Sequence, residues 1–205
     1  MSSAIEAVTL FANLEIGKVS EEEFFKLSTG DLRQLFSRFY FQVLGLEVFF
    51  SANLMPEAKE EFSLAICIPP SRLLRNSAKF KKNEETILPE ENIFLETLCE
   101  ILDFSGENKN FFIARTKREI NASEKNQRDS EKNILTSLEY LILREFFHWL
   151  TGQHLDCENT IITSTRNEEG EIIVFMINED GSFCLESRPG WLTFFSCNFT
   201  RKAIY

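Results

Sequence analysis

The sequence contains few of the residues that most often carry out chemistry in proteins. Its 205 residues include only 2 histidines and 5 cysteines. No two cysteines form a CxxC pair, which is the usual spacing in zinc and redox sites. The chain also has no GxGxxG, P-loop, GxSxG or HExxH sequence, so the common nucleotide-binding and hydrolytic motifs are missing. These absences favour a non-enzymatic protein, and we expect no metal and no cofactor.

The cysteines and residues 1–30 predict the cellular compartment in which the protein is found. An odd number of dispersed cysteines is typical of small buried side chains in a reducing environment rather than of a disulfide framework. The five are Cys67, Cys99, Cys157, Cys184 and Cys197. Residues 1–30 lack the basic region followed by an apolar run that secretion requires. We therefore expect a soluble, cytoplasmic protein.

Positive charge is also scarce, with 22 Lys and Arg against 32 Asp and Glu and a net charge of −10. Because phosphate backbones and anionic lipids repel such a chain, we expect no general nucleic-acid or membrane binding. The one sizeable basic cluster consists of Arg72, Arg75, Lys79, Lys81 and Lys82. A solvated loop or surface helix is its ordinary interpretation. The functional alternative is a contact for an acidic partner or a phosphate.

Phenylalanine, by contrast, is abundant, with 21 residues. Neighbouring side chains on a strand point to opposite faces. A strand that carries Phe194 and Phe195 therefore needs cover on both faces, or it leaves one ring exposed. Either helices cover a thick core, or the rings form an exposed surface for a partner or an apolar ligand.

The clearest helix lies between Asp129 and Gly152. Asp129 or Ser130 can cap its start, and Gly152 can end it. Its apolar residues cover far more than one side: Ile134, Leu135, Leu138, Leu141, Ile142, Leu143, Phe146, Phe147, Trp149 and Leu150. A helix that is apolar nearly all round is buried, and the charges at Glu139 and Arg144 argue against a membrane span. We predict a buried central helix over about 130–151.

Shorter patterns predict the other elements. Helices are predicted over 2–14, after a capping box formed by Ser20 and Glu23, over 31–50, and from Pro89 onward. Alternating apolar and polar residues predict strands over 61–68 and 110–115. After Gly152 the period changes to two, and four strands are predicted over 160–165, 171–177, 182–186 and 191–199.

Together these elements predict a single α+β domain over 1–205. N-terminal helices and the central helix would pack on a mainly antiparallel sheet. The turns between the last four strands are short, which permits only antiparallel neighbours and predicts a C-terminal four-strand meander. Residues 69–88 and 116–129 are expected to be mobile connections.

Both histidines lie close to a cysteine in the sequence. His148, His154 and Cys157 are residue types that bind metals, and a cysteine with a histidine is the pair that a nucleophilic enzyme uses. The two histidines, however, lack the i, i+4 spacing that would place them on one helix face, and no second ligand pair follows. Chance proximity is the preferred interpretation. A metal site or a Cys/His enzyme is the weaker one.

The order of a helix, Gly152 and a hairpin is similar to the closing part of the vinyl-reductase-like small-molecule-binding domains. Two further strands depart from that pattern. The resemblance implies a ligand sensor, in which a small apolar ligand or pigment would occupy an aromatic pocket beside the central helix.

The functional hypothesis that we prefer is a non-enzymatic protein-interaction module, such as an adaptor, chaperone or assembly factor. Its partner would be another protein or a second copy of the chain, which makes a homodimer possible. We expect the partner or ligand to contact aromatic residues of the C-terminal sheet and the central helix: Trp191, Phe194, Phe195, Phe183 and Trp149.

Overall fold

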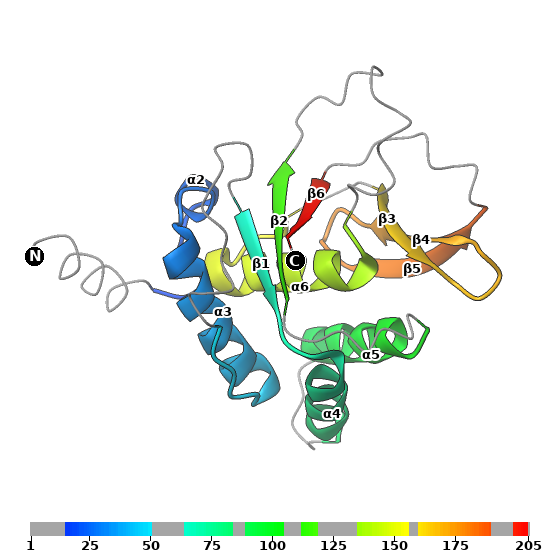
Figure 1. The fold of residues 1–205 in the computed structure, drawn as a ribbon, viewed down its shortest axis with the longest axis horizontal. Coiled ribbons are helices and arrows are strands. Elements are labelled where there is room, and N and C mark those ends of the chain that lie inside the picture. Colours follow the sequence, from blue (N-terminus) through cyan, green and yellow to red (C-terminus); the bar gives the residue numbers. More distant parts are fainter. Residues whose placement is uncertain are drawn as a thin grey trace, which may run out of the picture.

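The computed structural model describes residues 15–50, 64–83, 89–104, 112–118, 135–155, 160–189 and 199–204. These residues form an α+β structure, as predicted (Figure 1). The helices are α2 (Glu21–Phe24), α3 (Thr29–Leu44), α4 (Ser71–Lys82), α5 (Pro89–Phe104) and α6 (Ser137–Thr151). The strands are β1 (Leu64–Ile68), β2 (Phe112–Arg118), β3 (Thr160–Arg166), β4 (Ile172–Ile177), β5 (Phe183–Arg188) and β6 (Phe199–Ile204). The helix predicted over 2–14 lies outside the described residues.

The strands form two antiparallel sheets, in the orders β1-β2-β6 and β3-β4-β5. Tight turns closed by Gly170 and Gly181 connect β3 to β4 and β4 to β5. Three of the four strands predicted after Gly152 are thereby confirmed. Of the fourth, predicted over 191–199, only Phe199 is described, and it begins β6, which pairs with β2. A four-strand meander is therefore not confirmed.

Helix α6 runs across the middle of the molecule, behind β1 and β2 in Figure 1. It begins at Ser137, so the prediction of a start near Asp129 or Ser130 is wrong. The actual cap is a capping box, in which the Thr136 hydroxyl accepts from the Glu139 N–H at 3.3 Å and the Glu139 carboxylate accepts from the Thr136 N–H at 2.8 Å. The predicted end is confirmed, because Gly152 has a left-handed φ of 71°.

Phenylalanine rings bury α6 on the side that faces α2 and α3. The ring of Phe146 stacks on Phe36 at 3.8 Å between centroids and lies 5.7 Å from Phe39 and 5.9 Å from Phe24. On another side, Tyr140 contacts the ring of Phe175 in β4 at 4.8 Å. Almost all of the helix is buried, which confirms the prediction that it lies in the core.

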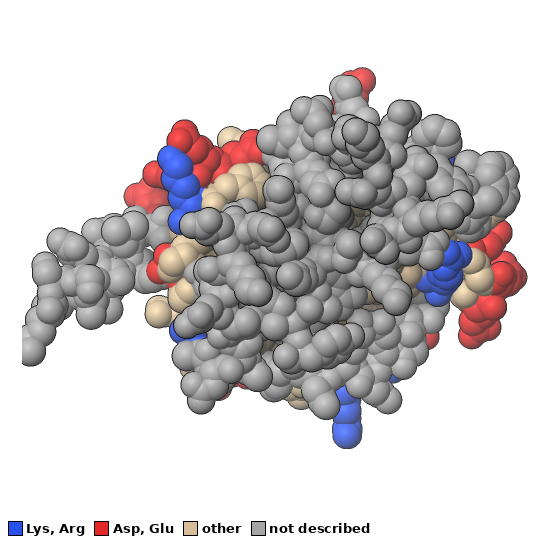
Figure 2. Space-filling model, turned by 45° about the horizontal axis from the view of Figure 1, so that its top comes forward, with Lys and Arg blue, Asp and Glu red and all other residues tan. Residues whose placement is uncertain are grey.

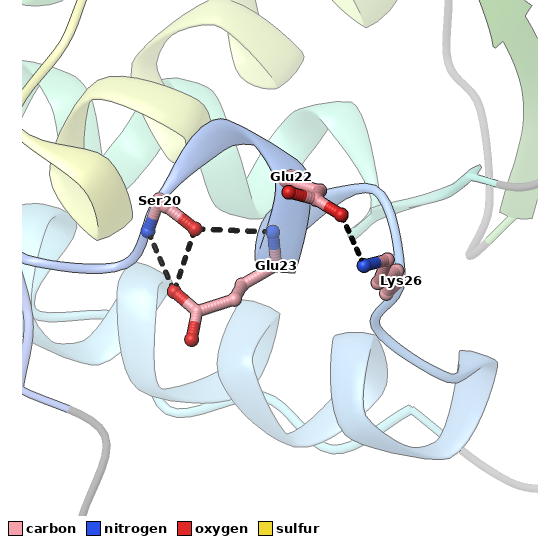
Figure 3. Close-up of polar contacts among 4 residues, drawn as sticks. All are labelled: Ser20, Glu22, Glu23 and Lys26. Carbon is pink, nitrogen blue, oxygen red and sulfur yellow. Dashed lines mark hydrogen bonds and ion pairs between the residues drawn. The ribbon is translucent and has the colours of Figure 1, made fainter.

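Capping boxes also start α2 and α3. The predicted box at Ser20 is confirmed, since the Glu23 carboxylate accepts the Ser20 N–H at 2.9 Å (Figure 3). Helix α3 begins after a second box at Ser28 and ends at Gly45, whose φ is 62°. The helix predicted over 31–50 therefore stops early, and residues 45–50 follow it without regular secondary structure.

Part of the predicted connection over 69–88 forms α4, which lies against α5 at the bottom of Figure 1. Arg75 pairs with Asp103 at 3.4 Å, and Lys82 pairs with Glu96 at 3.2 Å. The helix start predicted at Pro89 is confirmed. Among the described residues, no helix combines the length and the apolar character that a bilayer crossing needs.

We predict that Gly152→Ala lowers the free energy of unfolding by at least about 2 kcal/mol. A Cβ at this position would lie 2.8 Å from the Gly17 carbonyl oxygen, in addition to the strain of a positive φ. Gly170→Ala is the matched control, since its φ is 80° and nothing lies within 4 Å of the added carbon. Urea denaturation should show a loss of only about 1 kcal/mol for the control. Equal losses would contradict the close contact with Gly17.

We also predict that Phe146→Ala destabilises the protein by about 3–5 kcal/mol, because it removes a ring that contacts three other buried rings. Phe41→Ala removes the same atoms from an exposed helical position and should change stability by no more than about 0.5 kcal/mol. Thermal or chemical denaturation of the two variants measures the difference. Similar effects would show that Phe146 does not support the core.

Candidate functional site

The structure describes two of the five aromatic residues predicted to contact a partner. Trp191, Phe194 and Phe195 lie outside the described residues. The half-buried indole of Trp149 contacts Phe146 and donates its Nε1–H to Gln42 at 3.2 Å. These contacts fix Trp149 within the chain and leave it only partly accessible.

Phe183 is also half-buried, and it lies beneath a buried arginine. The Arg144 guanidinium is 4.5 Å from the Phe183 ring centroid and donates to the Gly181 carbonyl. The same arginine pairs with Glu145. These contacts join α6 to the turn between β4 and β5, so a structural role explains them.

The two histidines lie together at the end of α6. The rings of His148 and His154 stack with centroids 4.5 Å apart and planes 3° from parallel. The nitrogens of the two rings therefore lie in two parallel planes and do not converge on one point between the rings. Nδ1 of His148 lies 3.3 Å from the Gln153 carbonyl oxygen. The residues that the structure describes contain no group of three or more His, Cys, Asp or Glu side chains that could hold a metal ion. Cys157 lies outside those residues, so its part in a metal or enzyme site stays a prediction.

Next to the histidines, the turn between β4 and β5 presents a carboxylate. Hydrogen bonds from Ser182, above all, and the nearby charge of His154 hold the pKa of Asp180 below its ordinary value. His154 lies so close to Gly181 that an added Cβ would come within 2.0 Å of its ring. This arrangement packs the turn against the end of α6.

Burial raises the pKa of two of the cysteine thiols. It raises the pKa of Cys67 to about 12, and it also raises the pKa of the half-buried Cys99. The thiolate is the nucleophilic form, so both the burial and the raised pKa of Cys67 disfavour its reaction at neutral pH. The buried Tyr40 hydroxyl donates to the Cys67 carbonyl at 2.8 Å, which makes this a structural position. Cys184, by contrast, is exposed.

All five residues of the predicted anion contact lie on α4, and they differ in their neighbours. Arg75 and Lys82 form the ion pairs with α5 described above. Lys81 reaches toward the end of α3, with its Cε 3.6 Å from where a Cβ of Gly45 would lie. Within the part of the chain that the structure describes, Arg72 and Lys79 have no ion pair.

Sequence reasoning missed the most exposed rings among the residues that the structure describes. Phe41, Phe49 and Phe80 are 61%, 79% and 72% exposed. Phe41 lies on the solvent face of α3. Phe49 belongs to the segment after Gly45, where Val48 and Phe50 are buried and Phe49 is exposed. The sequence does contain a signal that Phe41 is exposed, because Phe41 does not fit the three- and four-residue steps of the buried face of α3.

Acidic residues gather at two places on the face that Figure 2 shows. Figure 2 shows Asp and Glu at the upper left, where α2 lies, and at the right edge, near the hairpin turns of the second sheet. The exposed carboxylates there include Glu21, Glu22, Glu168, Glu169 and Glu179. Helix α4 carries no acidic residue, so the charge of the described surface is unevenly distributed.

We predict that iodoacetamide at neutral pH labels Cys184 rapidly and leaves Cys67 unmodified until the protein unfolds. The physical reason is the exposure of one thiol and the raised pKa of the other. Peptide mass mapping after timed labelling, with and without urea, measures each cysteine separately. Cys184→Ser should remove only its own label. Rapid native labelling of Cys67 would contradict its burial.

The comparisons found no match to this chain among protein-family models, curated proteins or solved structures.

Proposed function

We propose that the protein is a non-enzymatic interaction module, an adaptor, chaperone or assembly factor, that docks a partner protein through exposed aromatic rings. The observation that carries this proposal is the contrast among its phenylalanines. The chain buries Phe24, Phe36 and Phe146 completely, yet it leaves Phe41, Phe49 and Phe80 mostly in water.

The energetic argument follows from the size of the ring. Full burial of a phenylalanine side chain is worth about 1.5–3 kcal/mol. Three rings left in water forgo that stabilisation, and a partner that covers them recovers it on binding. Aromatic residues are enriched in the cores of protein interfaces and often dominate the binding energy. Single exposed apolar residues are ordinary, so the number of rings and the extent of their exposure support the proposal.

The C-terminal sheet remains part of the proposal as a second surface. Trp191, Phe194 and Phe195, together with the half-buried Phe183 on β5, are the residues that we propose to contact a partner there. The proposal for Phe41, Phe49 and Phe80 does not depend on that prediction. The two surfaces can therefore be tested separately.

Photo-crosslinking tests the proposal. We predict that p-benzoylphenylalanine in place of Phe41, Phe49 or Phe80 captures one and the same protein in cells that express this chain. The same crosslinker at Glu22, on exposed α2, is the control and should not capture it. A triple variant with serine at the three positions should keep its unfolding free energy within about 1 kcal/mol and lose the partner.

Absence of any specific crosslink from the three positions, or equal capture from Glu22, would count against docking through these rings. Serine variants of Trp191, Phe194 and Phe195, assayed against the same captured protein, test the C-terminal surface. Loss of capture in those variants alone would move the docking site to the C-terminal sheet.

A further inference from the structure

The outward face of α4 carries two apolar side chains that repeat at a helical interval. Leu73 and Phe80 are seven residues apart and 38% and 72% exposed, while Ser71, Leu74 and Ala78 face the core. Seven residues make almost two helical turns. Leu73 and Phe80 therefore form one row along the solvent side of the helix.

A row of positive charge runs beside this apolar row. Arg72 and Lys79 directly precede Leu73 and Phe80 and repeat at the same interval of seven residues. Both are exposed, and among the described residues neither forms an ion pair. The outward face thus combines apolar area with unneutralised cations, and no acidic residue lies on the helix.

The adjacent row of α4 pairs with an acidic helix of the same chain. Arg75 and Lys82 are also seven residues apart, and they pair with Asp103 and Glu96. Those two carboxylates are themselves seven residues apart on α5, in antiparallel register with α4. Helix α5 is acidic, with no lysine or arginine. Within this chain, therefore, a basic row of α4 is already matched by an acidic helix with the same repeat.

We propose that the outer row of α4 docks an acidic amphipathic helix of a partner protein. Carboxylates that repeat every seven residues would pair with Arg72 and Lys79, and apolar residues beside them would cover Leu73 and Phe80. This inference rests on the proposed function and specifies one of its surfaces and the chemistry of the partner.

An acidic helix of a partner protein fits this face of α4 better than a nucleic acid, a membrane or a second copy of the chain. The net charge of −10 and the acidic surfaces near α2 and the hairpin turns repel long polyanions such as nucleic acids. Two apolar side chains give little area for insertion into a membrane. The carboxylates of α5 that match a basic row are already paired within their own chain, which disfavours a second copy as the partner.

Two designed peptides test the inference. One is a fluorescein-labelled helical peptide in which leucine and glutamate repeat every seven residues; in its matched control every glutamate is lysine. We expect fluorescence anisotropy to show binding of the acidic peptide only, and the binding should weaken as salt screens the charges. The double variant R72E/K79E should bind the acidic peptide at least about tenfold more weakly and should gain binding of the lysine peptide.

Two further variants distinguish an effect of the side chains on α4 from an effect of the net charge of the molecule. K18E/K26E changes the net charge by the same amount at exposed positions near α2 and should leave the affinity for the acidic peptide unchanged. Phe80→Ser should weaken binding without a change in charge. R72E/K79E should unfold at the same urea concentration as the parent chain to within a small shift, because it breaks no ion pair in the described residues.

The inference is overturned if the acidic peptide fails to bind, or if R72E/K79E and K18E/K26E behave alike. Binding of single-stranded DNA or phosphatidylglycerol vesicles that R72E/K79E abolishes, without peptide binding, would assign the row to those ligands instead. Light scattering that shows a dimer dissociated by R72E/K79E would assign it to a second copy. Persistent crosslinking from Phe41 and Phe49 in the R72E/K79E variant would leave the proposed function standing while this surface is rejected.

Discussion

Burial of α6 is the constraint on which the other elements depend. Its residues are apolar on nearly every side, so the helix needs a neighbour on each side to remove them from water. Phe36 of α3 stacks on one face, Phe175 of β4 covers another, and α2 contributes Phe24. The two sheets and the N-terminal helices are thus arranged around a single element. Helices α2, α3 and α5 and one strand of each sheet, β1 and β3, contact α6 directly.

The positions where helices begin are set by short-range hydrogen bonds. A hydroxyl and a carboxylate three residues apart satisfy the first free N–H groups at Ser20, Ser28 and Thr136. Each box places an acidic side chain where the helix dipole is positive. Together with left-handed glycines at the ends, these caps define elements that packing then assembles.

Helix caps and ends of this kind could be predicted from the sequence, because they depend on neighbouring residues. Features that depend on contacts between distant residues could not be predicted. The box at Ser20 and the stop at Gly152 need only neighbouring residues to be recognised. The start of α6 was missed because Thr136 lies within an apolar run, whereas Asp129 and Ser130 precede it and resemble a cap. The pairing of β6 with β2 could not be predicted in this way, because the two strands are far apart in the sequence and no short turn connects them.

The same distinction applies to the candidate surfaces. The basic cluster was recognisable by composition, but its division into a row paired with α5 and an outward row follows from the packing of two helices. The exposure of Phe41 and Phe80 depends on which faces other elements leave uncovered. A shared interval of seven residues in the basic and acidic segments was the available signal for the pairing of α4 with α5.

The end of α6 has a consequence for the order in which the chain folds. The Leu150 carbonyl accepts hydrogen bonds from the N–H groups of both Gly17 and Val19. These donors come from the far end of the sequence, so closing this contact requires a large loop, whose entropy cost must be met before the contact forms. The stacking of Phe36 on Phe146 closes a loop of similar length. Both contacts are therefore expected to form late relative to the capping boxes, which need only neighbouring residues.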